Sequence, residues 1–166
     1  MPTPNEIPPR PLAVLDIDGV LADVRYRLHH LEREPKNWSA FFAAAPGDAL
    51  LPEGAAVAAR LALDHEVVYL TGRPERCRRD TVAWLSRHGL PEGRLLMRAD
   101  EDRRPARQTK LAHLRRLART GTVAVLVDDD PDVVTAATRA GVPTLLADWV
   151  QRAEVLARAQ NRDGRS

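Results

Sequence analysis

The chain has 166 residues, of which 44% are hydrophobic and 29% are charged, and its formal net charge is +2. This size is typical of one globular domain with its own core, and so small a net charge does not by itself indicate a nucleic-acid partner. No apolar stretch approaches the roughly 18 residues that span a membrane, and the Pro-rich start lacks the apolar centre of a signal peptide. The single cysteine, Cys77, excludes an internal disulfide and suits a reducing compartment. We therefore predict a cytoplasmic protein that has no membrane partner.

Two carboxylates follow the first apolar run of the chain. Residues 12–15 are Leu-Ala-Val-Leu, a pattern typical of a buried parallel strand, and Asp16, Asp18 and Gly19 come directly after it. Side chains two residues apart in an extended backbone share a face, and ligands bind at the carboxyl ends of the strands in open α/β sheets. Asp and Gly are also common turn residues, so this stretch alone fits a ligand site or a solvated turn.

Two later apolar runs also end in polar side chains. The run at 66–71 leads into Thr71, Gly72 and Arg73, and the run at 122–128 leads into Asp128-Asp129-Asp130. Three strand ends of this kind, with helices between the strands, predict one shared site.

The remaining patterns alternate between helix and strand. The residues after the first strand, to about 53, contain no clear strand and form an insertion with short helices at 25–33 and 38–45. This alternation predicts a parallel sheet with helices on both faces. We expect a flexible arm at 1–10, a core at 11–150 with the insertion at about 20–53, and a C-terminal helix and tail at 151–166. The other predicted helices are 54–64, 74–88, 108–120 and 131–140, with a final helix at 149–160. The other predicted strands are 94–98 and 142–147.

The acidic strand ends suit magnesium-assisted phosphate chemistry. Oxygen ligands from Asp16, Asp18 and Asp128 favour Mg²⁺, and no Cys/His cluster has zinc spacing. Asp16 is the natural nucleophile toward phosphorus, and Asp18 can protonate the leaving oxygen and then deprotonate water. Thr71 can hold the phosphoryl oxygens, and Lys110 can stabilise the growing negative charge. Asp130 and Asp132 are expected to cap the helix that begins at Pro131.

This set of motifs resembles the haloacid dehalogenase-like (HAD) phosphohydrolases. The matching segments are Asp16-Ile-Asp18-Gly-Val, Thr71-Gly-Arg, Lys110 and Asp128-Asp129. The resemblance implies a Rossmann-like core with a small helical cap-like insertion after the first strand, an aspartyl-phosphate intermediate and Mg²⁺ dependence. Asp129 would ligate the metal through water or brace Lys110, because adjacent side chains point apart.

Within that superfamily, the chain is most similar to the phosphatase domain of polynucleotide kinase-phosphatases, over about residues 11–150. Arg73 follows Thr71-Gly72 where those domains have Ser/Thr-Gly-Arg, and Arg27 stands where they have an arginine near the substrate. Asp102-Arg-Arg104 leads into the helix with Lys110, like their Asp-x-Arg segment. The resemblance therefore implies phosphate or substrate contacts for Thr71, Gly72, Arg73, Arg27 and Arg104.

The sequence departs from that family at two points. The position four residues before Lys110 is usually acidic and is Ala106 here, which affects the expected positioning of the lysine. No Gly-x-x-x-x-Gly-Lys-Ser/Thr loop occurs, so the kinase half of those proteins is absent. We therefore interpret the chain as a stand-alone phosphatase.

A short insertion predicts a partly covered site that admits the end of a polymer. Basic residues that can flank the entrance attract phosphates without reading sequence. We therefore predict removal of 3′-phosphates from nucleic-acid ends. A nucleotidase or small-molecule phosphatase is the first alternative, and a catalytically weak HAD-like binding module, favoured only by Ala106, is the second. The arginines in question are residues 27, 73, 76, 78, 79, 103, 104 and 107.

Overall fold

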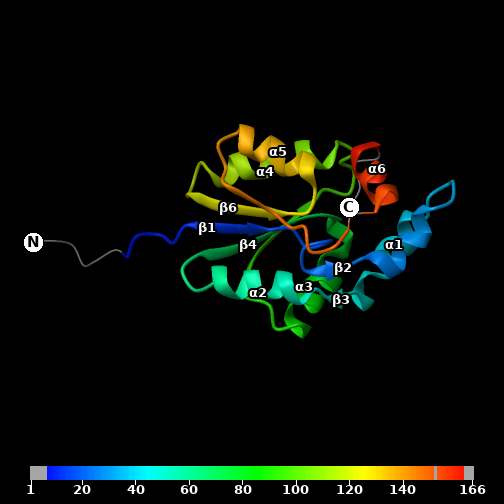
Figure 1. Ribbon diagram of the computed structural model, residues 1–166, viewed down its shortest axis with the longest axis horizontal. Helices are drawn as coiled ribbons and strands as arrows, with labels where there is room; N and C mark the ends of the chain where they lie inside the picture. The colour runs from blue at the N-terminus through cyan, green and yellow to red at the C-terminus, as the bar shows by residue number, and fades with distance from the viewer. Residues whose placement is uncertain (1–6, 152, 163–166) are drawn as a thin grey trace, which may run out of the picture.

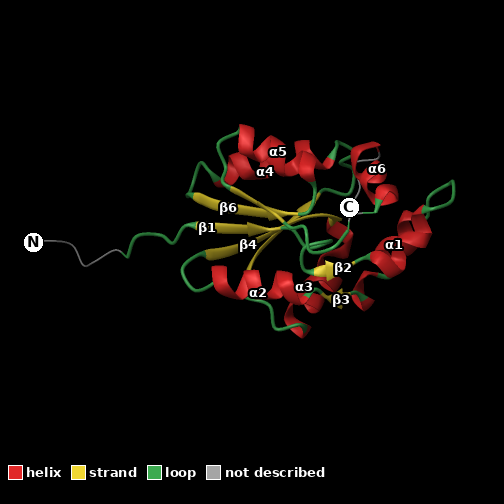
Figure 2. Ribbon diagram, viewed as in Figure 1, coloured by secondary structure: helices red, strands yellow, loops and turns green. Residues whose placement is uncertain are grey.

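A parallel sheet of five strands forms the centre of the molecule (Figures 1 and 2). The computed structural model describes residues 7–151 and 153–162. The strand order is β5-β4-β1-β6-β7, and every neighbouring pair is parallel. This arrangement confirms the predicted Rossmann-like α/β class. The strands are β1 (Leu12–Leu15), β4 (Glu66–Pro74), β5 (Gly93–Arg98), β6 (Val123–Asp128) and β7 (Thr144–Leu146).

Helices cover both faces of the sheet, because alternate residues of the central strand point to opposite sides. In β1, Ala13 and Leu15 pack into one core cluster together with Trp84 of α3. Val14 packs into the other cluster, which includes Leu114 of α4. In Figure 1, α4 and α5 lie above the sheet, and α2 and α3 lie below it. These helices are α2 (Pro52–Leu61), α3 (Arg78–Arg87), α4 (Ala106–Leu117) and α5 (Pro131–Arg139).

The insertion after β1 contains two short strands that the sequence patterns do not predict. They pair antiparallel as a separate two-stranded sheet, and two residues each are too few to show an alternating pattern. Trp38, Phe41 and Phe42 form the small core of the insertion, and α6 packs against it. The elements here are β2 (Ala22–Asp23), η1 (Arg25–Leu31), α1 (Trp38–Ala43), η2 (Ala45–Gly47), β3 (Ala49–Leu50) and, after the core, α6 (Glu154–Arg162).

Several element boundaries differ from the sequence prediction. Strand β4 continues beyond Thr71 to Pro74. Its pairing with β5 is irregular between Leu70 and Pro74, where Pro74 pairs with Arg98. The short helix η3 (Glu75–Cys77) separates it from α3. Helix α6 begins at Glu154 rather than Trp149, whose Nε1 donates to the Val20 carbonyl at 3.0 Å. The described ranges contain no helix that is both long and apolar enough to cross a membrane. Most of the predicted arm, and the last residues of the tail, lie outside the described residues.

Candidate active site

The candidate site lies at the carboxyl ends of three adjacent strands. Strand β1 lies between β4 and β6, with β4 and β5 on one side of it and β6 and β7 on the other. The strand order therefore reverses direction at β1, and open α/β sheets bind ligands at such a switch point. Asp16 follows β1 directly, and its backbone N–H donates to the Val127 carbonyl of β6 at 2.9 Å. Asp128 is the last residue of β6. The pairing of β1 with β6 therefore brings the first and last acidic motifs together.

A lysine bridges two carboxylates at the centre of this site. Lys110 of α4 places Nζ 2.8 Å from Oδ2 of Asp16 and 2.7 Å from Oδ2 of Asp128. Asp129 joins them, since Asp16, Asp128 and Asp129 each offer an oxygen within 4.8 Å of the others. A Cβ at Gly19, whose φ is +80°, would lie 2.2 Å from Oδ2 of Asp129. Only glycine fits at this turn, which explains the Gly in the first motif.

Burial and neighbouring charges shift the pKa values of this group. Burial raises the pKa of Asp16 to about 7, with the Asp128 carboxylate acting in the same direction and Lys110 opposing both. For Lys110, burial acts to lower the pKa, but the carboxylates of Asp128 and Asp16 outweigh it and raise the pKa. The lysine therefore stays charged and offsets part of the negative charge of the cluster.

The three carboxylates fit a hard divalent cation. They are all buried, and their oxygens lie close enough to repel one another strongly unless a cation is shared between them. Mg²⁺ binds through a few carboxylate oxygens and keeps several waters. The carboxylate of Asp18, which we also predicted as a ligand, is not in this group. It points instead toward two arginines.

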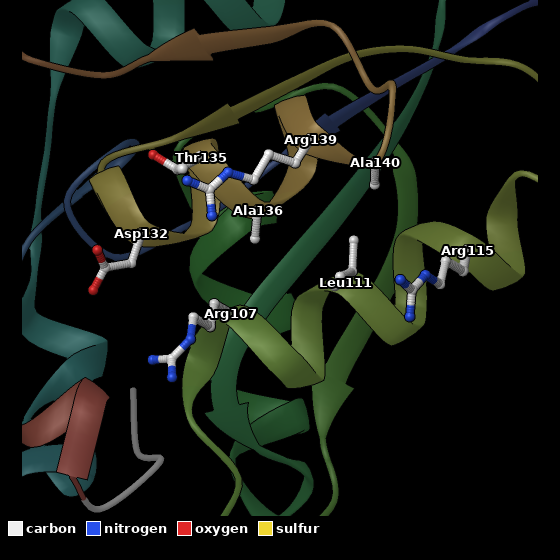
Figure 3. A pocket seen from close by; sticks show the side chains of 8 residues that line it. All are labelled: Arg107, Leu111, Arg115, Asp132, Thr135, Ala136, Arg139 and Ala140. Carbon is white, nitrogen blue, oxygen red and sulfur yellow. The ribbon is translucent and has the colours of Figure 1, made fainter.

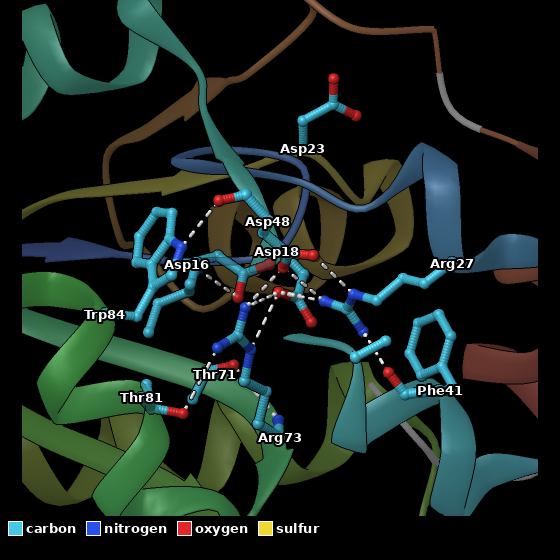
Figure 4. A network of polar contacts seen from close by, with 12 residues as sticks. Asp16, Asp18, Asp23, Arg27, Phe41, Asp48, Thr71, Arg73, Thr81 and Trp84 are labelled. Carbon is cyan, nitrogen blue, oxygen red and sulfur yellow. Dashed lines mark hydrogen bonds and ion pairs between the residues drawn. The ribbon is translucent and has the colours of Figure 1, made fainter. Parts of the chain in front are cut away.

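Asp18 belongs to a buried ring of charges (Figure 4). Arg73 donates to Oδ1 of Asp18 through Nε at 2.9 Å and through Nη2 at 2.6 Å. Arg27 donates to the same oxygen through Nη2 at 3.1 Å. Both guanidinium groups also contact Asp48, with Arg27 bound by two hydrogen bonds of 2.8 Å and Arg73 by one of 3.1 Å. All four residues are at most 2% exposed, so the two arginines and two aspartates balance their charges away from water.

The ring keeps Asp18 ionised. Burial acts to raise its pKa, but Arg73 and Arg27 outweigh burial and lower the pKa to about 2. The other oxygen of this carboxylate, Oδ2, is buried and has no hydrogen-bond partner among the described residues. Further contacts hold the ring in place. Trp84 Nε1 donates to the Asp48 carbonyl at 2.9 Å, and Arg73 donates to the Thr81 hydroxyl at 3.3 Å.

The other predicted residues have different positions. Thr71 is buried beside the ring, and its hydroxyl accepts from the Arg73 backbone N–H at 3.2 Å. The carbonyl of Gly72 accepts a hydrogen bond from Arg98 at 3.3 Å. Arg104 lies apart from the carboxylates, because its exposed guanidinium binds Asp102 at 2.7 Å. As expected, Asp130 caps α5.

The site is more covered than the sequence predicts. Among the predicted catalytic and metal-binding residues, Asp129 has the largest exposed fraction, at 8%. The others are Asp16, Asp18, Asp128 and Lys110. The cause is local: the ring encloses Asp18, and Lys110 fills the space between Asp16 and Asp128. Two of the arginines expected at the entrance, Arg27 and Arg73, are buried in the ring.

Sequence reasoning missed Asp48, the residue that closes the ring. It follows Pro46-Gly47 between η2 and β3, where the pattern indicates only a helix break. No motif or spacing marks it. Arg98 was missed too: it is buried and donates to the carbonyls of Gly72 and Arg104. It thereby connects β5 to the last part of β4 and to the loop before α4.

The match to a protein-family model decides the family. The model for the phosphatase domain of polynucleotide kinase (PNKP), a branch of the HAD superfamily, matches residues 11–148. The chain belongs to this family. It is thus a phosphatase domain of the HAD type, with the fold and the four motifs that the resemblance implied. A comparison with curated protein sequences finds no significant match.

Solved structures share the fold of this PNKP-type phosphatase domain. Two are described as the Pnkp1/Rnl/Hen1 complex and the Pnkp1/Rnl/Hen1 RNA repair complex, with TM-scores of 0.67 and 0.68 and identities of 24% and 23%. The matches cover 84% and 87% of this chain but only 45% and 44% of those chains, so this chain spans less than half of their length. A haloacid dehalogenase-like hydrolase from Streptococcus pneumoniae has a TM-score of 0.61 at 14% identity, over 92% of this chain and 91% of its own.

Proposed function

We propose that this domain is a Mg²⁺-dependent phosphomonoesterase that removes 3′-phosphates from nucleic-acid ends through an aspartyl-phosphate intermediate. One observation carries the proposal: Asp16 lies in contact with Lys110 and beside Asp128 and Asp129, with Asp18 two residues away. A nucleophile, a fixed positive charge and a metal-type carboxylate cluster are the parts that phosphoryl transfer requires.

Each chain residue then has a defined role. An oxygen of Asp16 attacks phosphorus and the bond from phosphorus to the leaving oxygen breaks. The ionised carboxylate of Asp18 takes up the proton that the phosphate monoanion brings into the site and passes it to that leaving oxygen. Water then attacks the same phosphorus and passes a proton to Asp18, while the bond from phosphorus to Asp16 breaks and releases inorganic phosphate. The unpartnered Oδ2 of Asp18 is the oxygen available for both transfers, and its ionised state suits the second half of the cycle.

The other side chains bind charge. Asp16, Asp128 and Asp129 would hold Mg²⁺, which offsets the repulsion between the carboxylates and an anionic phosphate. Lys110 adds a second positive charge beside Asp16, and Thr71 and the backbone near Gly72 would hold phosphoryl oxygens. Arg27 and Arg73 orient Asp18 through the hydrogen bonds described above. Arg104, with its guanidinium held by Asp102, would contact substrate only at the periphery.

The substrate class rests on family and on neighbours. The family is defined by the phosphatase domain of a polynucleotide kinase, and two chains of the same fold come from complexes described with Pnkp1, Rnl and Hen1, one of them as an RNA repair complex. We extend from those proteins to this chain a phosphorylated nucleic-acid end as substrate, and a separate ligase or kinase as a functional partner.

The test is phosphate release from a panel of substrates with and without Mg²⁺. The panel contains a 3′-phosphate oligonucleotide, a 5′-phosphate oligonucleotide, 3′- and 5′-mononucleotides and an aryl phosphate. We expect a preference for the 3′-phosphate strand that chelation abolishes. Asp16→Asn should reduce turnover at least about 10³-fold because it removes the attacking carboxylate. Glu53→Gln, an exposed change on α2, is the matched control and should retain activity.

The other outcomes separate the alternatives. Preference for a mononucleotide would replace the proposed substrate by the nucleotidase alternative and keep the mechanism. Full activity in Asp16→Asn would overturn the mechanism. No turnover on any substrate would favour the binding-module alternative, and Ala106→Asp would then test whether the missing acidic residue is the reason.

A further inference from the structure

A groove between α4 and α5 lies outside the candidate active site (Figure 3). It has a volume of about 480 Å³. Its floor is apolar, with Leu111 from α4 and Ala136 from α5, and arginines stand along its sides. The groove therefore combines a neutral floor with cationic walls, the pattern of a surface that follows a sugar-phosphate backbone.

The three arginines of this groove carry uncompensated charge. Within residues 7–151 and 153–162, the side chains of Arg107, Arg115 and Arg139 make no hydrogen bond or ion pair. Asp132 is the one carboxylate among the residues that line the groove. Of the arginines that we expected at the entrance, Arg107 alone lines this groove. Arg78 and Arg104, for example, are paired with Glu75 and Asp102.

Helix geometry places these arginines in rows along the groove. Arg107 and Arg115 are eight residues apart and share a face of α4 with Leu111 between them, a separation of about 12 Å along the axis. Asp132 and Arg139 share a face of α5 in the same way. A ligand that contacts all three guanidinium groups must be extended and must carry several negative charges.

Residues at one end of the groove are near active-site residues in the sequence. Arg107 precedes Lys110 by one helical turn on α4, and Asp132 follows Asp130 at the start of α5. We propose that this groove binds the backbone of a single-stranded nucleic acid whose terminal phosphate occupies the site of Asp16. The inference rests on the proposed function and adds the path that the rest of the strand follows.

The test uses two arginines that are remote from the chemistry. Arg115→Gln/Arg139→Gln removes two groove charges. The matched control, Arg60→Gln/Arg162→Gln, removes two exposed arginines of α2 and α6 whose side chains have no partner among the described residues. Binding of a fluorescein-labelled 12-nucleotide strand with a 3′-hydroxyl is measured by anisotropy over a salt series. Two lost phosphate contacts predict about tenfold weaker binding at low salt and a log–log salt slope smaller by about 1.4. The control pair should change binding less than about twofold.

Kinetics separate this proposal from the proposed function. Turnover of a 3′-mononucleotide should be the same in the groove variant and the wild type, while KM for a 3′-phosphate 12-mer should rise about tenfold. Equal effects of the two double variants, or a larger effect of the control pair, would overturn the groove. Binding that depends on the groove without any phosphate release would instead overturn the proposed function. If the wild type does not bind the strand, the groove proposal is wrong.

Discussion

Asp48 connects two arginines from different parts of the chain. Arg27 belongs to the insertion and Arg73 to the end of β4, and both donate to the Asp48 carboxylate inside the protein. Burial raises the pKa of Asp48 even though both arginines act to lower it. The carboxylate is thus expensive to bury and is held there by the two cations, so its removal leaves them uncompensated.

Asp48→Asn should therefore lower both stability and activity. We expect a loss of about 3 kcal/mol in the free energy of unfolding, as when one partner of a buried ion pair is removed. Activity on the preferred substrate should fall at least about tenfold, because Asp18 loses its fixed partners. Urea unfolding and steady-state kinetics measure the two effects.

The matched control for this residue is Asp23→Asn. Asp23 also lies in the insertion and pairs with an arginine, but that partner, Arg25, is 62% exposed in its side chain. Exposed pairs contribute little, so the control should change stability by less than about 0.5 kcal/mol. Equal stability of the two variants would show that the buried ring has no structural role.

At the scale of elements, helix α2 approaches the loop after β1 without a gap. A Cβ on Gly54 would lie 1.8 Å from the backbone oxygen of Val20. That oxygen also accepts a hydrogen bond from Trp149, so it has little room to move. The contact fixes where the chain re-enters the core after the insertion.

Gly54→Ala should destabilise the protein although alanine is the better helix former. Alanine gains about 1 kcal/mol over glycine inside a helix, but a clash with packed backbone costs about 1–3 kcal/mol, so we expect a net loss of about 1 kcal/mol. Thermal unfolding measures it. Gly121→Ala is the control, because a Cβ there would meet Leu12 at an ordinary 3.6 Å. A variant at position 54 as stable as the control would contradict the close approach.

At the scale of the whole molecule, ion pairs determine how the fold responds to acid. Asp102 accepts hydrogen bonds from the side chain and backbone of Arg104, and these hold the pKa of Asp102 below its ordinary value of 3.8. A carboxylate with a lowered folded-state pKa binds protons more weakly than in the unfolded chain. Its stabilisation is complete above pH 3.8 and is lost as the pH falls below that value.

Asp102→Asn should therefore flatten the acid side of the stability curve. At pH 7 the variant should be less stable by about 1 kcal/mol, the contribution of a small set of hydrogen bonds. The difference should shrink as the pH falls from about 4 toward 2, because the wild type then loses the same interactions. Urea midpoints at pH 7, 4 and 3 test this. A difference that stays constant over that range would contradict the lowered pKa.

The sequence predicts the sheet and the central carboxylates for a physical reason. A buried strand reads as a short apolar run, and the polar residue that follows it marks where the strand reaches the edge of the sheet. Asp16 and Asp128 could be placed in this way. Asp48 could not, because its partners come from other segments and only the folded insertion brings them together. The strands β2 and β3 could not be predicted either, because two residues are too few to show the alternation of apolar and polar side chains.

The strand order has a consequence for how the protein is made. Strand β1 is synthesised first, yet its two neighbours are β4 and β6, and an insertion and several helices separate it from both. A nascent chain that ends before β6 can pair β1 with β4, but it leaves the other edge of β1 open and lacks Asp128. Sheets built from distant segments form late and expose unpaired edges meanwhile. The carboxylate centre is therefore completed only after β6 has been synthesised and has paired with β1.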